Sequence, residues 1–218
     1  MIAFKFIIIA VISYLLGSLN FGVILSRGMK NEDVRDSGSG NAGTTNMMRT
    51  YGKTLGLLTI AGDILKVVLA IWLAFRIVSV EELKMTLDSA SEYPQVVLKS
   101  FAGLFAVLGH IFPCYFKFKG GKGVATSGGM VIAIDWRIAL ILLAIFALTI
   151  LITKYVSLGS ILMAIFYPVF IGIFYKDIIL VLIALVFTVI VVVAHRENVK
   201  RLINHTENKI GSKKKKKE

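Results

Sequence analysis

The chain has 218 residues, of which 56% are hydrophobic, and its mean hydropathy is +0.79. Soluble domains are roughly 45–50% apolar, so this composition excludes an ordinary soluble protein, and the net charge of +12 fits basic loops beside anionic lipid better than binding to nucleic acid. The single cysteine, Cys114, excludes an intramolecular disulfide and a metal site built from cysteines.

Continuous apolar runs, instead of alternating ones, predict an all-α membrane protein. Seven such runs follow one another along the chain, at residues 2–26, 55–78, 96–112, 124–134, 138–152, 156–175 and 178–194. A helix needs about 20 apolar residues to cross the bilayer, and at ~1.5 Å per residue the fourth run covers only about half of the ~30 Å hydrocarbon core. The topology therefore depends on whether this fourth run spans.

The distribution of charge favours counting the fourth run as a span. Seven crossings then place most lysines and arginines on one side, in residues 27–53, 114–123, Lys154 and the tail, and the acidic segment 79–95 on the other. Cytoplasmic loops carry an excess of Lys and Arg. The sequence therefore predicts seven transmembrane helices, with the N-terminus outside and the C-terminus cytoplasmic. It also places Gly120–Gly123 at membrane depth, where irregular backbone must line a protein cavity.

No connection between these runs is long enough to hold a soluble domain. We expect one integral-membrane domain over residues 1–210 and a basic C-terminal tail over residues 211–218, which would contact anionic lipid headgroups.

A glycine-rich stretch lies between the first two runs, from Ser37 to Asn46, and is closed by Arg49. Glycines allow close approach of the backbone to a ligand, consecutive N–H groups can form an anion-binding concavity, and the guanidinium is suited to phosphate. The plain alternative is a flexible polar loop.

Two later segments carry similar chemistry. Lys119 and Lys122 flank glycines just before an apolar helix, whose N-terminus favours an anion. This is not a Walker A motif, because Gly123 follows Lys122 where that motif has Ser or Thr. In the tail, His195 and Asn198 share a face if the last helix continues. Four cations of these segments, Arg49, Lys119, Lys122 and Arg201, exceed the need of one phosphate monoester and suggest two phosphate-bearing substrates, or a substrate and a phosphate leaving group.

Asp63 and Lys66 lie three residues apart within the second run, on one helical face. Charges inside a membrane are costly and face the protein interior. We interpret the two residues as a structural ion pair, with a direct catalytic role as the alternative, and we interpret His110 as a packing residue.

Four motifs, in order, resemble the bacterial acyl-phosphate-dependent glycerol-3-phosphate acyltransferases over about residues 10–210. They are Gly38-Ser-Gly-Asn-Ala-Gly-Thr-Thr-Asn46 with Arg49, Gly109-His-Ile-Phe-Pro113 with Phe118-Lys-Gly-Gly-Lys-Gly-Val-Ala-Thr126, Tyr155-Val-Ser-Leu-Gly-Ser160, and His195-Arg-Glu-Asn-Val-Lys-Arg-Leu202. The resemblance implies transfer of a fatty acyl group from acyl phosphate to the 1-position of glycerol 3-phosphate, giving lysophosphatidic acid and phosphate, the first step of membrane phospholipid synthesis.

The resemblance also implies roles for single residues. Its catalytic group would be His195, Ser39 and Lys122, with a substrate phosphate instead of a protein base taking the proton. Its substrate-binding group would be Gly40, Asn41, Gly43, Asn46, Arg49, Lys119, Gly121, Gly123, Ser160 and Asn198. No metal and no cofactor are expected. Whether His195 acts as a base or orients a substrate stays open at this point.

The same resemblance implies a multi-pass protein of the bacterial plasma membrane with its site facing the cytoplasm. Its partners would be acyl phosphate, glycerol 3-phosphate, membrane lipids and, transiently, the enzyme that supplies acyl phosphate. The chain departs from the family at Asn20, where Pro is common, and at His205, where Gly is usual, so the placement of Glu207 is uncertain from sequence.

Two other classes compete with an enzyme. A transporter of a phosphorylated metabolite would suit the intramembrane charges but predicts inverted repeats and a path to the far side. We find no repeat, and the phosphate-binding candidates lie on one face. A lipid-binding scaffold would explain the lysine-rich tail but not the motifs.

Overall fold

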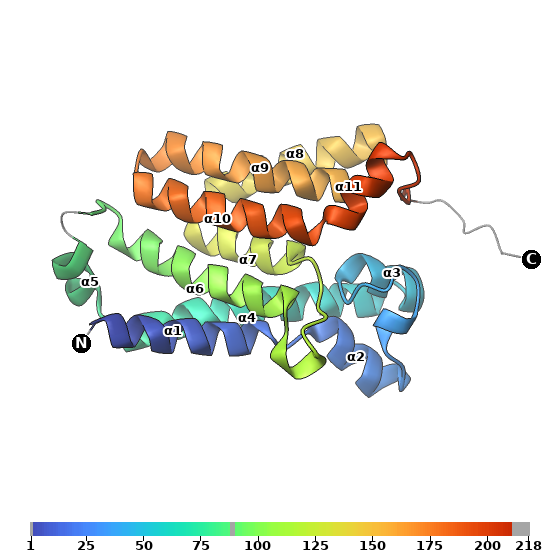
Figure 1. Ribbon diagram of the computed structural model, residues 1–218, viewed down its shortest axis with the longest axis horizontal. Coiled ribbons are helices and arrows are strands. Elements are labelled where there is room, and N and C mark those ends of the chain that lie inside the picture. Colours follow the sequence, from blue (N-terminus) through green and yellow to red (C-terminus); the bar gives the residue numbers. More distant parts are fainter. Residues whose placement is uncertain (1, 88–89, 211–218) are drawn as a thin grey trace, which may run out of the picture.

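The computed structural model describes residues 2–87 and 90–210, and within these ranges the chain is helical and contains no strand (Figure 1). The predicted basic tail, 211–218, lies outside the described residues. The helices are α1 (Ile2–Gly17), α2 (Phe21–Lys30), η1 (Val34–Asp36), α3 (Thr44–Tyr51), α4 (Lys53–Ile77), α5 (Val80–Leu87), α6 (Pro94–Ile111), η2 (Cys114–Phe116), α7 (Val124–Ile134), α8 (Trp136–Thr153), α9 (Val156–Tyr175), α10 (Ile178–Ala194) and α11 (Arg196–Ile203).

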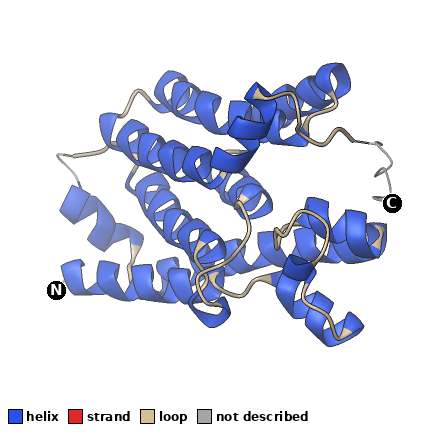
Figure 2. Ribbon diagram, turned by 45° about the vertical axis from the view of Figure 1, so that its right-hand side comes forward, coloured by secondary structure: helices blue, strands red, loops and turns tan. Residues whose placement is uncertain are grey.

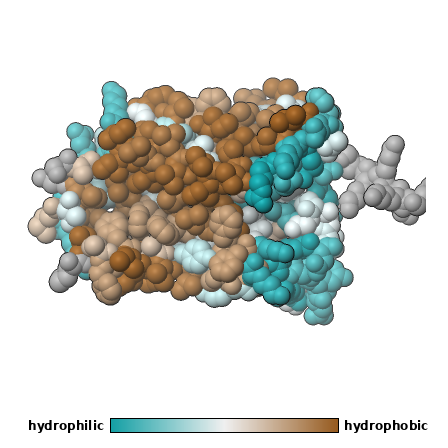
Figure 3. Space-filling view, in the orientation of Figure 1, coloured by the Kyte–Doolittle hydropathy of each residue, from teal (hydrophilic) through white to brown (hydrophobic). Residues whose placement is uncertain are grey.

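Five helical segments of the described chain are long and apolar enough to cross a membrane, or six if α10 and α11 count as one broken span. Helix α7, with 11 residues, is apolar but shorter than this criterion. The prediction of an all-helical membrane protein is therefore confirmed. Figure 3 shows the corresponding surface, a broad apolar band that ends in a hydrophilic cap at the right.

The interior of the bundle is formed by α1, α4, α6, α7, α9 and α10, which contribute most of the buried apolar side chains. Helix α8 packs mainly on α9 and buries only Ile138 and Leu142, so most of its surface faces outward. Such a helix, apolar all round but little buried, is the pattern of a lipid-facing span.

The first apolar run is not one continuous helix. Asn20 interrupts it, and its Oδ1 accepts a hydrogen bond from the backbone N–H of Val23 at 3.3 Å, which caps the separate helix α2. Gly17 packs so tightly that a Cβ there would lie 2.1 Å from the carbonyl oxygen of Ala106. Residues 2–30 still count as one candidate span, in agreement with the predicted span over 2–26, but its helix is interrupted, and the small residues do mark a close helix–backbone contact.

Two segments predicted as loops contain helices. Residues 27–53 hold the end of α2, together with η1 and α3, and residues 79–95 hold α5. The last helix does not run straight into the tail either, because α10 and α11 meet at an angle of 61°. His195 is the residue at this bend.

The polar segments gather at one end of the bundle. Helices α2, α3 and α11 and the loop before α7 lie together at the right of Figure 1, opposite the N-terminus and α5, and Figure 2 shows the same grouping. The backbone N–H of Ile210 donates to the carbonyl of Lys154 at 2.9 Å, which fixes the C-terminal segment on the α8–α9 turn. The segments predicted to converge do so.

Candidate active site

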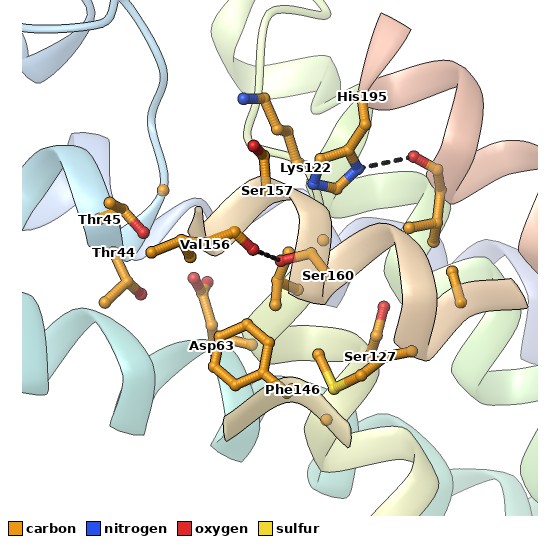
Figure 4. A pocket seen from close by; sticks show the side chains of 18 of the residues that line it. Thr44, Thr45, Asp63, Lys122, Ser127, Phe146, Val156, Ser157, Ser160 and His195 are labelled. Atoms are coloured by element: carbon orange, nitrogen blue, oxygen red, sulfur yellow. Dashed lines mark hydrogen bonds between the residues drawn. The ribbon is translucent and has the colours of Figure 1, made fainter. Parts of the chain in front are cut away.

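A cavity of about 670 Å³ opens among these segments and continues into the bundle (Figure 4). Its polar part is lined from α3, the loop before α7, α9 and α11. Its inner part is lined by apolar side chains of α7, α8, α9 and α10, including Val131, Leu142, Phe146, Met163, Phe187 and Val191. The cavity is therefore amphiphilic, with a polar mouth and an apolar arm.

The glycine-rich stretch is held in shape by Asn46. Its Nδ2 donates to the carbonyls of Val34 and Ser37, both at 2.9 Å, and its Oδ1 accepts from the backbone N–H of Ser39 at 2.8 Å. Gly38 has a φ of +66°, and a Cβ there would come within 2.1 Å of Asn46 Oδ1. These hydrogen bonds give the loop a defined conformation, which argues against the alternative of a flexible polar loop.

Arg35 ties this loop to the one before α7. Its Nη1 donates to the carbonyls of Phe116 at 3.0 Å and Lys119 at 2.8 Å, while Asp33 pairs with the rest of its guanidinium. These hydrogen bonds outweigh burial and hold the pKa of Asp33 below its usual range. Arg35 was not among the predicted site residues, because its role depends on a contact between distant segments.

The loop before α7 folds back along the end of α6. Gly120 and Gly121 donate to the carbonyls of Ile111 and His110, both at 3.2 Å. A Cβ on Gly121 would lie 2.2 Å from His110 Nε2, so only glycine fits there. This backbone leaves Lys122 and Gly123 lining the cavity.

Lys122 carries a positive charge at a partly buried position. Burial lowers its pKa to about 8, and the nearby positive charges of Arg201 and Arg49 act in the same direction, while Glu207 opposes them. Neither the ammonium group of Lys122 nor the guanidinium group of Arg49 forms an ion pair or hydrogen bond with another described residue. An anionic ligand would relieve this excess of positive charge.

His195 and Ser160 both line the cavity, and Figure 4 shows each of them hydrogen-bonded to a backbone carbonyl. The ring Nδ1 of His195 lies 2.8 Å from the carbonyl oxygen of Val191. A carbonyl only accepts, so Nδ1 is the donor and Nε2 of the neutral ring keeps a free lone pair. The hydroxyl of Ser160 donates to the carbonyl of Val156 at 3.0 Å and can still accept a hydrogen bond.

Glu207 organises the C-terminal side of the site. Its carboxylate accepts from Ser157 at 3.0 Å, Asn198 at 2.8 Å and Arg201 at 2.7 Å. Burial alone would raise the pKa of Glu207, but these hydrogen bonds outweigh burial and hold it below its usual value. His205, which replaces the usual glycine, has a φ of +54°, so the backbone turn survives with a non-glycine residue.

Most of the predicted site residues line this one cavity. These are Ser39, Asn41, Gly43, Asn46, Arg49, Lys122, Gly123, Ser160, His195 and Asn198. Three predicted residues are not in its lining, namely Gly40, Lys119 and Gly121. Gly40 forms the turn with a φ of +71°, Lys119 is exposed, and Gly121 lies behind the loop against His110.

The intramembrane charges form the predicted ion pair, with Lys66 Nζ at 2.8 Å from Asp63 Oδ1. Asp63 and His110 also line the cavity, so the alternative of a role for Asp63 at the site stays open, whereas the sequence indicated only a packing role for His110. Among the described residues, no group of three His, Cys, Asp or Glu side chains could hold a metal ion.

Comparisons with known proteins agree on one family. The family model described as glycerol-3-phosphate acyltransferase matches residues 7–205. A glycerol-3-phosphate acyltransferase of Clostridioides difficile is 42% identical over 97% of this chain and 98% of its own length. That of Bacillus subtilis is 40% identical over 93% of this chain and 96% of its own length.

Two solved structures share the fold. The integral membrane glycerol 3-phosphate acyltransferase PlsY in its glycerol 3-phosphate form has a TM-score of 0.81 and 33% identity, covering 94% of this chain and 96% of that one. Its lysophosphatidic acid form has a TM-score of 0.78 and 32% identity, with 94% and 95% coverage.

Proposed function

The chain belongs to the glycerol-3-phosphate acyltransferase family, and from that premise we propose that it takes its acyl group from acyl phosphate and places it on the 1-position of glycerol 3-phosphate. The products are lysophosphatidic acid and phosphate. This is the first step of phospholipid synthesis, and it uses no cofactor.

The observation that carries this proposal is the amphiphilic cavity. Its mouth holds Arg49, Lys122 and Arg201, while its arm is lined by apolar side chains between α7 and α10. A reaction that joins a soluble phosphate ester to a fatty acyl chain needs both surfaces in one place. The surplus of cations over carboxylates suits two phosphate groups, one on each substrate.

Within this scheme Ser39, Asn41 and Gly43 of the glycine-rich loop line the phosphate site, while the backbone N–H groups of Ser39 and Gly43 donate to Asn46 and Asn41 and so fix the shape of the loop. Lys122 and Arg49 neutralise phosphate charge, and Ser160 and Asn198 position glycerol 3-phosphate. Gly40, Gly121 and Lys119 act through the shape of their loops, since they lie outside the cavity lining.

The chemical step needs little covalent help from the protein. The 1-hydroxyl oxygen attacks the acyl carbonyl carbon, a carbon–oxygen ester bond forms, and the bond between that carbon and the phosphate oxygen breaks. The hydroxyl proton passes to a phosphate, which is itself a weak base. Positioning and electrostatic stabilisation of the leaving phosphate supply most of the acceleration.

His195 orients the attacking hydroxyl in this scheme. Its Nδ1 is committed to the carbonyl of Val191, so the free Nε2 can accept a hydrogen bond from a substrate hydroxyl. We assign His195 this orienting role instead of that of the base. The phosphate of glycerol 3-phosphate is itself a weak base and lies close to the 1-hydroxyl of the same molecule.

The test is phosphate release by the purified protein in detergent. Release from palmitoyl phosphate should require glycerol 3-phosphate and should produce lysophosphatidic acid in equal amount. Palmitoyl-CoA should not replace palmitoyl phosphate, because the short loops offer no large adenine-binding surface. Equal rates with the two donors would overturn the donor assignment while leaving the family unchanged.

For the topology we propose seven spans in a bacterial plasma membrane, with the site on the cytoplasmic side. Helix α7 supports this, because its C-cap Asp135 accepts a hydrogen bond at 3.0 Å from Tyr175, the last residue of α9. Since α9 begins beside Glu207 at the opposite end, the short α7 reaches the far end of the bundle.

Cys114 provides a direct check of this topology. A membrane-impermeant maleimide should leave it unlabelled in intact cells and should label it in inverted vesicles. Labelling from outside would contradict the seven-span arrangement.

We also propose that residues 1–210 act as one domain, that the tail 211–218 contacts anionic lipid, and that the enzyme supplying acyl phosphate docks transiently. Deleting the tail should lower binding to anionic vesicles but leave turnover in detergent within about twofold, because lipid attraction is worth about 1 kcal/mol per charge.

A further inference from the structure

A neutral buried cluster lies below the cavity mouth, between α4 and α6. Lys66 Nζ lies 2.8 Å from Asp63 Oδ1, 2.9 Å from His110 Nδ1 and 3.0 Å from the carbonyl oxygen of Leu19. Lys66 therefore hydrogen-bonds to Leu19 and His110 and forms an ion pair with Asp63, which places a positive charge beside the carboxylate.

Asp63 itself is not fully satisfied. Its side chain is 1% exposed, yet neither carboxylate oxygen has a hydrogen-bond partner among the described residues, and only Oδ1 has the Lys66 ammonium beside it. Asp63 lines the cavity, and Figure 4 shows its carboxylate pointing into the space between Thr44 and Val156. A buried carboxylate oxygen without a donor is costly, unless a ligand supplies one.

Two hydroxyl groups elsewhere in the cavity lining share this property. Thr44 Oγ1 on α3 and Ser127 Oγ on α7 are buried, without a partner in the described chain, and line the same cavity. A ligand in this cavity therefore meets an acceptor-only carboxylate and two further buried groups that can donate or accept.

The charges decide which ligand group belongs there. A phosphate would be repelled by the Asp63 carboxylate and attracted to Lys122, Arg49 and Arg201. A hydroxyl, in contrast, would donate a charge-assisted hydrogen bond to the carboxylate. A molecule with phosphate at one end and hydroxyls at the other is therefore favoured in one orientation, with its phosphate near the three cations and a hydroxyl near Asp63.

We propose that Asp63 binds the hydroxyl at C2 of glycerol 3-phosphate, the one that is not acylated, and so makes the enzyme specific for a polyol phosphate. The inference rests on the proposed function. The ion pair with Lys66 suits Asp63 to holding a hydroxyl instead of removing its proton, so the reacting 1-hydroxyl is left to His195 and the substrate phosphate.

The alternative is that Asp63 only holds α4 against α6. A structural role would lower activity equally toward every acceptor. A hydroxyl-binding role changes the discrimination between acceptors that have and lack the C2 hydroxyl. Comparing two acceptors in two proteins separates these cases.

The experiment measures kcat/KM with palmitoyl phosphate and either glycerol 3-phosphate or 3-hydroxypropyl phosphate, which lacks the C2 hydroxyl. The unaltered protein should prefer glycerol 3-phosphate by about tenfold or more, since a hydrogen bond to a charged group is lost with the analogue. In Asp63→Asn the preference should shrink to about threefold or less. An unchanged preference would refute the proposal.

Asp135→Asn is the matched control. Asp135 is also buried, but it lies at the opposite end, where it pairs with Arg137 and Tyr175. This variant should keep the full preference. If Asp63→Asn does not accumulate, Asp63→Glu keeps the charge but displaces the carboxylate, and it too should lose preference. A parent protein that shows no turnover dependent on glycerol 3-phosphate would refute the proposed function instead.

Discussion

The two ends of the helical bundle differ in whether all the charged groups that define them have partners. At the end of the bundle near α5, Asp135 is paired with Arg137 and Tyr175, Lys5 with Glu82, and Asp177 accepts a hydrogen bond from Ser91. At the site end, Arg201 pairs with Glu207 and Arg35 with Asp33, but Lys122 and Arg49 have no such side-chain partner within the described chain.

This difference separates structure from function. Paired charges neutralise each other, and individually they contribute little to stability when exposed. Unpaired cations in a partly buried cavity cost free energy in the empty protein, and only a bound anion repays it. The comparison therefore predicts that substitutions of equal chemistry have unequal effects at the two ends.

The largest difference in activity between substitutions at the two ends should come from Lys122→Ala. It removes a charge-assisted contact to phosphate in a partly dry cavity, so we expect kcat/KM to fall by roughly a hundredfold or more. The readout is phosphate release dependent on glycerol 3-phosphate. Arg137→Ala removes an exposed cation paired at the opposite end and should change the rate by less than about twofold. Similar losses in both variants would remove the distinction between the ends.

Asn46→Ala should give the next largest effect. It deletes three hydrogen bonds that fix the glycine-rich loop, each worth about 1 kcal/mol. We expect a loss of roughly tenfold to a hundredfold in kcat/KM and a lower Tm. Asn204→Ala, at an exposed position after α11, is the matched control and should behave like the unaltered protein. A normal rate in Asn46→Ala would show that the loop holds its shape without this side chain.

His195→Gln tests whether His195 orients the attacking hydroxyl or removes its proton. A glutamine can still donate or accept a hydrogen bond but cannot take a proton, so an orienting role predicts a loss of about tenfold with measurable turnover. Abolished turnover with intact binding of glycerol 3-phosphate would identify His195 as the base. Binding of labelled glycerol 3-phosphate is the control measurement.

The dependence of kcat/KM on pH tests the unpaired charge of Lys122 directly. The pKa of Lys122 is lowered to about 8, so the free enzyme loses this positive charge as pH rises above that value. At low glycerol 3-phosphate, kcat/KM should therefore fall toward tenfold per pH unit above pH 8. Lys122→Arg carries a charge that persists beyond pH 12 and should flatten this decline, whatever its absolute rate. A parallel decline in both proteins would assign the pH dependence to another group.

Much of this site could be predicted from the sequence, because its motifs are local. The glycine-rich stretch, Lys122 and His195 stand in short patterns whose chemistry is readable without a fold. The convergence of these segments followed from the charge distribution across the spans. The break at Asn20 was missed, because an apolar run reads as one helix until a side chain is seen to cap the next.

Contacts between distant segments could not be predicted. Arg35 bridges two loops through backbone carbonyls, and any residue can supply a carbonyl. The unpartnered oxygen of Asp63 is visible only once its neighbours are placed. Gly40 and Gly121 were grouped with the binding residues because the motif gives composition, whereas the structure shows which glycines serve the turn or the packing.

The smallest effect concerns the backbone, where the two ends should respond alike. His205 at the site end and Lys176 at the opposite end both have positive φ, +54° and +51°. The left-handed conformation costs a non-glycine residue roughly 1 kcal/mol, and the greater entropy of glycine in the unfolded chain offsets part of the gain. His205→Gly and Lys176→Gly should each raise Tm by about 1–3 °C.

Alanine variants at the same positions keep the Cβ and should not raise Tm, which makes them the controls. His205→Gly should also leave the KM for glycerol 3-phosphate unchanged, because Glu207 is held by Ser157, Asn198 and Arg201 and not by His205. A raised KM confined to His205→Gly would show that the side chain helps to place Glu207. The departure from the usual glycine would then be a feature of the site and not only a strained turn.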